Sequence, residues 1–202
     1  MKTFLGLLIA LGGSILSPAF GADAAPAPPD KSIVMIGDSI THQGNWEQLL
    51  GRNDVVNWGI PGYTTGQLGW TFKDVVREHP RVTVVFLEGG INDLTLGVPS
   101  DRIFTNYLQA IAWWREHGVI PVVQSVILKT DEPATNAAIS ALNARLHDYC
   151  SVNHVEFLDL NAVLASDGHL KPELSTDGTH LQPAAYPLWA GLVKACLARL
   201  GR

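Results

Sequence analysis

The stretch "IVMIGDSITHQGNW", residues 33–46, decides how the rest of the chain is interpreted. It begins with an apolar run, and Gly37-Asp38-Ser39 follows directly. A short apolar run that ends in turn residues is typical of a strand buried on both faces. A strand-to-helix turn does not require a serine at its tip. Ser39 is therefore either a helix cap or a nucleophile, and the other segments must decide between the two.

Four further apolar runs resemble the first one. The five predicted strands span residues 32–37, 55–58, 82–88, 119–128 and 155–160. Helix-length segments lie between and after them, at residues 46–50, 66–78, 101–117, 134–151 and 183–200. This alternation predicts an α/β fold with a five-stranded parallel sheet covered by helices on both sides. In such sheets, ligands bind beyond the carboxyl ends of the strands.

Composition limits the classes of function. The chain has 202 residues, of which 47% are hydrophobic and 16% charged, so one domain with a sizeable core is expected. The net charge of -5 is spread without long runs, and no basic stripe marks a nucleic-acid or anionic membrane surface. The expected partners are small or neutral molecules.

The first residues have the pattern of an export signal. Lys2 precedes an apolar stretch at residues 4–16, which is too short to span a bilayer, and small residues follow it. We predict a secretory signal peptide at residues 1–24, with cleavage after Gly21, Ala22 or Ala24, and an Ala/Pro-rich tether at residues 25–31. The folded domain then spans residues 32–202, and the product is secreted or periplasmic without a stable membrane anchor. An uncleaved anchor or a buried N-terminal helix is the alternative.

Candidate site residues follow several of the predicted strands and precede the last helix. Ser39 follows the first strand, Gly62 the second and Asn92 the third, while Asp177 and His180 come shortly before residues 183–200. In a hydrolytic site, Ser39 would attack a carbonyl, His180 would take its proton, and Asp177 would orient the imidazole. The backbone N–H groups of Ser39 and Gly62 and the side-chain amide of Asn92 would bind the oxyanion.

These residues lie in blocks that resemble the SGNH hydrolases, also called the GDSL esterase/lipase family. The blocks are "GDSI" at residues 37–40, "NWGIPGYTT" at 57–65, "GGIND" at 89–93 and "DGTHLQPAAY" at 177–186. Ile40 replaces the leucine of the name-giving tetrapeptide, a swap of similar volume. The resemblance implies a flavodoxin-like, three-layer α/β/α sandwich without a metal or organic cofactor. No Gly-x-Ser-x-Gly elbow is present, which argues against the α/β-hydrolase fold.

Several site residues have other interpretations. Asp177 and His180 could form a surface capping pair, and His42 follows Ser39 at the same spacing that separates Asp177 from His180. His42 lacks an evident carboxylate partner, so we rank it below His180 as the base. Asp93 is expected to cap the helix or turn after the third strand. Glu88, at the end of that strand, either braces the oxyanion loops or marks an exposed strand end.

The two cysteines carry no recognisable motif. Cys150 and Cys196 are unpaired in the sequence pattern, and no His-Glu-x-x-His helix occurs, so no metal site is expected. In an exported protein, the two could form one disulfide between the fourth predicted helix and the last, or remain as two buried thiols.

The expected activity is that of a secreted serine ester hydrolase that works through an acyl-enzyme. The alternatives are a lysophospholipase or thioesterase of the same family, an acyltransferase, and a non-catalytic carbohydrate-binding relative. Residues 41–46 and 59–67 are polar and short, which favours short acyl groups over long lipid chains. The aromatic residues near these loops suit sugar rings or the core equally well; they are Trp46, Trp58, Tyr63 and Trp70. A small-molecule or carbohydrate acyl ester is therefore the expected substrate.

Overall fold

The computed structural model describes residues 32–202. The predicted signal peptide and tether lie outside the described residues. Within them, the predicted five-stranded parallel sheet is confirmed, and its strand order is β2-β1-β3-β4-β5. The strands are β1 (Ile33–Gly37), β2 (Val55–Gly59), β3 (Val84–Leu87), β4 (Ile120–Gln124) and β5 (Glu156–Leu158). All residues of β1 and β3 are buried, as expected for central strands covered on both faces.

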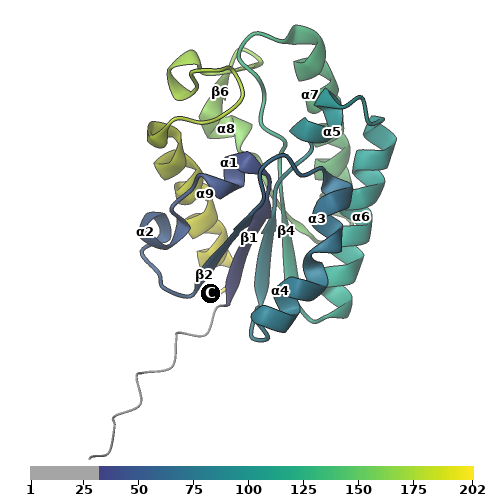
Figure 1. Ribbon diagram of the computed structural model, residues 1–202, viewed down its shortest axis with the longest axis vertical. Helices are drawn as coiled ribbons and strands as arrows, with labels where there is room; N and C mark the ends of the chain where they lie inside the picture. Colours follow the sequence, from purple (N-terminus) through teal and green to yellow (C-terminus); the bar gives the residue numbers. More distant parts are fainter. Residues whose placement is uncertain (1–31) are drawn as a thin grey trace, which may run out of the picture.

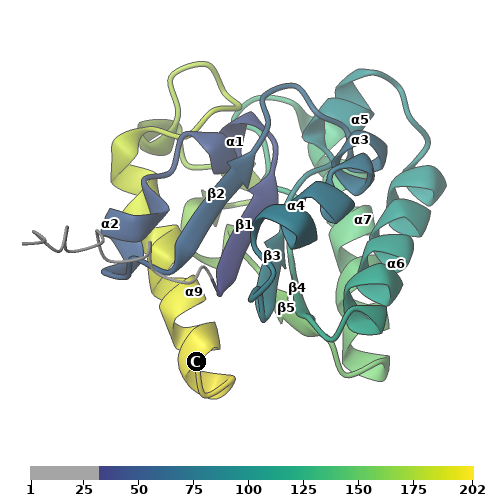
Figure 2. The same cartoon turned by 60° about the horizontal axis from the view of Figure 1, so that its bottom comes forward.

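Helices cover both faces of this sheet (Figure 1). One face carries α3 (Thr65–Trp70), α4 (Phe72–Glu78), α6 (Ser100–Glu116) and α7 (Pro133–Val152). The other carries α2 (Trp46–Leu50) and α9 (Tyr186–Arg199), which pack against each other (Figure 2). Short elements lie in the connections: α1 (Ser39–His42), α5 (Ile91–Thr95), α8 (Asn161–Leu164), the 3-10 turns η1 (Pro172–Leu174) and η2 (Pro183–Ala185), and the hairpin strands β6 (Ala165–Ser166) and β7 (His169–Leu170). The three-layer α/β/α sandwich is thus confirmed.

The chain order of the strands creates a switch point beside β1. The chain passes from β1 to β2 on one side and then returns to place β3 on the other side. Loops after β1 and β3 therefore diverge at their carboxyl ends, which opens the crevice where ligands of such sheets bind. Ser39 and Asn92 lie on these two loops.

Two predicted elements differ most from the structure. The helix predicted at residues 66–78 is divided at Thr71, whose backbone N–H and hydroxyl both donate to the carbonyl of Leu68 and so close the turn of α3. The strand predicted at residues 119–128 ends at Gln124. Residues beyond it stay buried because side-chain amides replace the hydrogen bonds of a neighbouring strand. Asn143 accepts from the backbone N–H of Val126, and Asn161 accepts from that of Leu128.

Both cysteines are buried free thiols, on α7 and α9 respectively. Burial raises the pKa of Cys150 to about 12 and that of Cys196 to about 11, so both are protonated at neutral pH. Of the two arrangements left open by the sequence, the structure has the unbonded one.

Candidate active site

The turn after β1 places Ser39 at the first residue of α1, while Asp38 takes the capping role. Asp38 is the N-cap, and its Oδ1 accepts from the N–H of Ile40 at 2.9 Å. The hydroxyl of Ser39 is consequently not used as a cap. Its Oγ lies 2.9 Å from Nε2 of His180, 141 residues further along the chain. The geometry therefore favours the nucleophile over the cap for Ser39.

Gly37 makes this tight turn possible by its lack of a side chain. A Cβ atom at this position would lie 2.1 Å from Oγ1 of Thr41 and 2.9 Å from Oε2 of Glu88. These two oxygen atoms are themselves hydrogen-bonded at 2.9 Å, with Thr41 donating. Glycine thus leaves room for a buried carboxyl group directly beneath the nucleophile turn.

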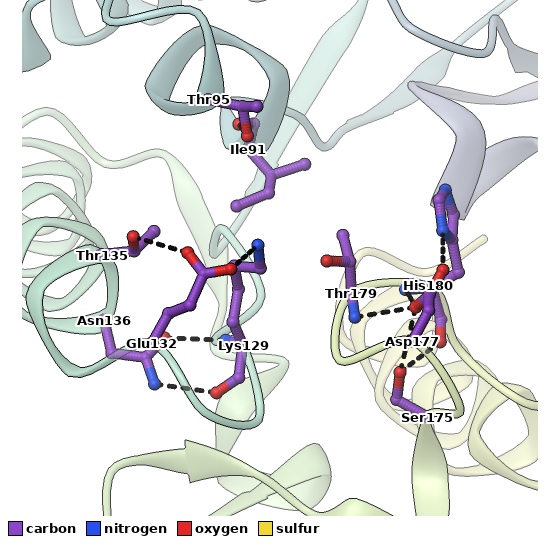
Figure 3. A network of polar contacts seen from close by, with 10 residues as sticks. All are labelled: Ile91, Thr95, Lys129, Glu132, Thr135, Asn136, Ser175, Asp177, Thr179 and His180. Atoms are coloured by element: carbon purple, nitrogen blue, oxygen red, sulfur yellow. Dashed lines mark hydrogen bonds and ion pairs between the residues drawn. The ribbon is translucent and has the colours of Figure 1, made fainter.

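One short loop, which we call the acid–base loop, carries both Asp177 and His180 (Figure 3). Oδ2 of Asp177 lies 2.7 Å from Nδ1 of His180, and Oδ1 accepts from the backbone N–H groups of Thr179 at 2.9 Å and His180 at 2.7 Å. Ser175 closes the loop by donating from its Oγ to the His180 carbonyl at 2.7 Å. The carboxylate therefore fixes both the ring and the backbone of the histidine.

The predicted oxyanion residues converge on the same place from two other loops. Gly62 adopts φ +80°, and its turn is closed by the N–H of Tyr63, which donates to the carbonyl of Ile60. This backbone conformation favours glycine. The side-chain amide of Asn92 donates to the carbonyl of Tyr63 at 3.0 Å and approaches Oδ2 of Asp38 at 3.4 Å. Asn92 thus links the loops that follow β1, β2 and β3.

Three carboxyl groups around the site differ in pKa. The hydrogen bond from the His180 ring holds the pKa of Asp177 well below its ordinary value, with help from two backbone N–H groups. Burial raises the pKa of Asp38 to about 6. Burial, together with the negative charge of Asp38, raises the pKa of Glu88 well above its ordinary value. Negative charge is therefore favoured next to His180 and disfavoured beneath Ser39.

The remaining candidates have structural contacts. Nδ1 of His42 lies 3.0 Å from the carbonyl of Gly59, and the side chain is exposed. Asp93 accepts from the N–H and Oγ1 of Thr65, both at 2.8 Å, and so fixes the start of α3. Glu88 is 1% exposed, so it is not an exposed strand end. It braces the nucleophile turn through Thr41, whereas the sequence pointed to the oxyanion loops.

Sequence reasoning missed the loop between β4 and α7, which faces the acid–base loop. Lys129 and Glu132 form an ion pair there, and Thr135 donates to Glu132 at 2.8 Å. Figure 3 shows this cluster across from Thr179, with Ile91 and Thr95 of α5 above. The N–H of Thr130 donates to the carbonyl of Gly178 at 3.1 Å and ties the two loops together. No motif in the sequence marks these contacts.

A doubly wound parallel sheet with Ser39, His180 and Asp177 aligned at its carboxyl edge agrees with the resemblance to the SGNH hydrolases. Residues 35–188 match the GDSL-like Lipase/Acylhydrolase family. The chain belongs to this family.

Solved structures share the fold. A GDSL-like lipase from Bacteroides thetaiotaomicron is 22% identical with a TM-score of 0.76, covering 86% of this chain and 92% of that one. A lipase/acylhydrolase from Enterococcus faecalis is 20% identical with a TM-score of 0.71, covering 84% and 96%. The esterase EstA from Pseudoalteromonas sp. is 15% identical with a TM-score of 0.67, covering 85% and 98%.

The curated relatives are longer proteins. An N-acylneuraminate cytidylyltransferase from Streptococcus agalactiae is 27% identical over 149 residues, which are 69% of this chain and 36% of that protein. The chain therefore spans about a third of the length of the curated relatives it matches. Within residues 32–202, no helix is long and apolar enough to cross a membrane, and no three His, Cys, Asp or Glu side chains group as metal ligands.

Proposed function

We propose that the protein is a serine ester hydrolase that cleaves short acyl esters, with a carbohydrate as the alcohol part. The observation that supports it most is the continuous relay from Ser39 Oγ to His180 Nε2 at 2.9 Å and from His180 Nδ1 to Asp177 Oδ2 at 2.7 Å. A non-catalytic binding protein has no need for this alignment.

In the first half of the reaction, Ser39 Oγ attacks the ester carbonyl and its proton passes to Nε2 of His180. The tetrahedral oxyanion is bound by the N–H groups of Ser39 and Gly62 and by Nδ2 of Asn92. To do so, Asn92 gives up its long 3.4 Å contact with Asp38 and keeps the 3.0 Å bond to Tyr63. Collapse releases the alcohol, which takes the proton from His180, and leaves an acyl group on Ser39.

In the second half, water attacks the acyl-enzyme with His180 again as the base. Water reaches this loop easily, since the side chains of His180 and Asp177 are 40% and 53% exposed. An acyltransferase must protect its acyl-enzyme from water, so this exposure favours hydrolysis over transfer.

The surface around the relay favours a short acyl group. Four large hydrophobic side chains are strongly exposed within residues 32–202: Trp70, Leu96, Val152 and Leu188. None of them lies in residues 39–46, 59–64 or 175–181, which surround the relay. These three loops themselves therefore offer little apolar surface to a long alkyl chain. A carbohydrate is favoured as the alcohol part because the curated relatives have an acylated sugar, N-acylneuraminate, in their names.

A series of p-nitrophenyl esters from acetyl through octanoyl to palmitoyl tests the proposal. We expect kcat/KM to be highest for acetyl to butyryl esters, and a fluorophosphonate to label the wild-type protein but not Ser39→Ala. Each buried methylene can contribute about 0.8 kcal/mol, so a site for long chains would show activity that climbs along the series. That result would replace the short-acyl proposal with a lysophospholipase or thioesterase. Equal labelling of Ser39→Ala would refute the nucleophile.

The acceptor and the location need separate measurements. Added alcohols should leave the ratio of free acid to p-nitrophenol at one, whereas formation of a new ester would indicate an acyltransferase. We also propose that the protein is exported by residues 1–24. Mass spectrometry of the mature N-terminus tests this, and a chain that retains Met1 in the cytoplasmic fraction would contradict it.

A further inference from the structure

A groove with a volume of about 740 Å³ lies beside the candidate active site and is not used by the relay. It runs between α3 and α6, with α4 and the end of α5 at its margins. These helices lie on the face of the sheet opposite α9 (Figure 2). Its volume is in the range of ~300 to 1,000 Å³ found for small-molecule sites. The groove is open to solvent, so a chain-like ligand can lie along it.

Trp70 forms an exposed aromatic surface in this groove. It is 76% exposed, although indole rings are usually mostly buried. Trp46 is buried and Trp58 is half-buried, whereas the ring of Trp70 is open to a ligand. Trp113 lines the groove from α6. Its ring is held in place by stacking on the ring of His117, with the two ring centroids 3.8 Å apart. A flat, exposed ring next to polar groups is the surface on which sugar rings pack.

The polar groups of the groove come mainly from α6. Asn106 and Gln109 present side-chain amides, and Asn106 is fixed by donating to Oγ1 of Thr65 at 2.8 Å. Arg102, one turn before Asn106, is exposed, and within residues 32–202 its guanidinium forms no hydrogen bond or ion pair. The acidic side chain in the groove, Asp93, is already occupied by the N–H and hydroxyl of Thr65. The free guanidinium is thus available to a carboxylate, which it can bind with two parallel hydrogen bonds.

The groove is continuous with the oxyanion side of the active site. Its lining begins at Thr64, directly after Tyr63, whose carbonyl accepts from Asn92. Asp93, the residue after Asn92, lines it from α5. Two consecutive residues of α5 therefore contact the active site and the groove. Asn92 approaches Asp38 in the nucleophile turn, and Asp93 bonds to Thr65 at the start of α3.

We infer that the groove between α3 and α6 is a binding subsite for a saccharide chain that carries carboxylate groups. Trp70 packs against a sugar ring, Asn106 and Gln109 bond to hydroxyl groups, and Arg102 pairs with a carboxylate. The saccharide then positions an ester on a neighbouring sugar at Ser39. This assignment rests on the proposed ester hydrolase for its purpose, but binding in the groove can be measured without any hydrolysis.

Calorimetric titration of the full chain tests this subsite. The probes are oligogalacturonate, hyaluronan oligosaccharides and oligosialate, with neutral cellohexaose as the comparison, in buffer of physiological ionic strength, where the Debye length is about 8 Å. We expect at least one acidic probe to bind. Trp70→Ala should weaken that binding at least tenfold. Arg102→Gln should weaken it about tenfold while changing cellohexaose binding less than twofold.

Two control variants on α9 address unspecific effects. Leu188→Ala removes another exposed hydrophobic side chain, and Lys194→Gln removes another exposed positive charge. Both should bind the acidic probe like the wild type. Urea unfolding shows that all four variants are folded, and the two α9 variants should also hydrolyse p-nitrophenyl acetate at the wild-type rate.

The outcomes separate the two proposals. Failure of all acidic probes to bind, or unchanged binding in Trp70→Ala and Arg102→Gln, would overturn the subsite and leave the esterase intact. Equal losses in the α9 controls would also overturn it. Binding that depends on Trp70 and Arg102, in a protein that cleaves no ester, would support the subsite and contradict the proposed hydrolase.

Discussion

Replacing Asp38 with asparagine should flatten the pH dependence of stability. The wild-type carboxyl group is fully buried, and its pKa rises from the ordinary value of 3.8 to about 6 on folding. Below about pH 4 the group is protonated in both states and has no effect. As the pH rises, the unfolded chain releases the proton first, so the free energy of unfolding falls until the folded group is also ionised near pH 6. The difference between a pKa of 3.8 and one of about 6 lowers the free energy of unfolding by ~3 kcal/mol.

Urea unfolding at about pH 3 and pH 7 measures this loss. We expect the decrease between the two pH values to be smaller in Asp38→Asn than in the wild type by ~3 kcal/mol. Comparing the decrease, not the absolute stability, cancels any pH-independent cost of placing an amide next to Asn92. Asp148→Asn, at a side chain that is 82% exposed, should keep the wild-type decrease. If Asp38→Asn and the wild type lose equal stability, the buried carboxyl group does not titrate as argued.

Two further substitutions test the geometry of the site. Asn92→Ala should lower kcat by ~100- to 1,000-fold with little change in KM, because the lost donor acts on charge that forms only in the transition state; steady-state kinetics with p-nitrophenyl acetate would contradict this if KM alone changed. Gly37→Ala should destabilise the protein by ~3 to 5 kcal/mol in urea, because the new Cβ displaces the Thr41 hydroxyl from its bond to Glu88. The control Gly191→Ala, where a Cβ meets nothing within 4 Å, should be neutral or slightly stabilising.

The fold could be predicted from the sequence because its signals are local. Each strand of a doubly wound sheet is buried on both faces, so it is a continuous apolar run without alternation. The helices between the runs have apolar residues at helical spacing. The carboxyl ends of parallel strands meet at one edge, so Ser39, Gly62 and Asn92 could be placed near one another without knowing any contact. Even so, the sequence does not predict the division of residues 66–78 into α3 and α4. This division depends on the hydroxyl of Thr71, which donates to the carbonyl of Leu68.

Contacts between distant segments could not be predicted in the same way. Glu88 bonds to Thr41 across 47 residues, and nothing in either segment names the other as its partner. The ion pair of Lys129 and Glu132 has an ordinary spacing, and only the fold places it across from Thr179. The exposure of Trp70 was equally hidden, since an aromatic residue in an amphipathic segment is more often part of the core.

The separation of Ser39 from His180 along the chain has a consequence for biosynthesis. In the proposed mechanism, a growing polypeptide contains the nucleophile early, but the base is added 141 residues later. The elements η2 and α9 follow this loop and come last in the fold. A nascent or truncated chain that stops before this segment carries an unactivated serine. In that mechanism, the hydrolytic activity arises only when synthesis of the domain is nearly finished.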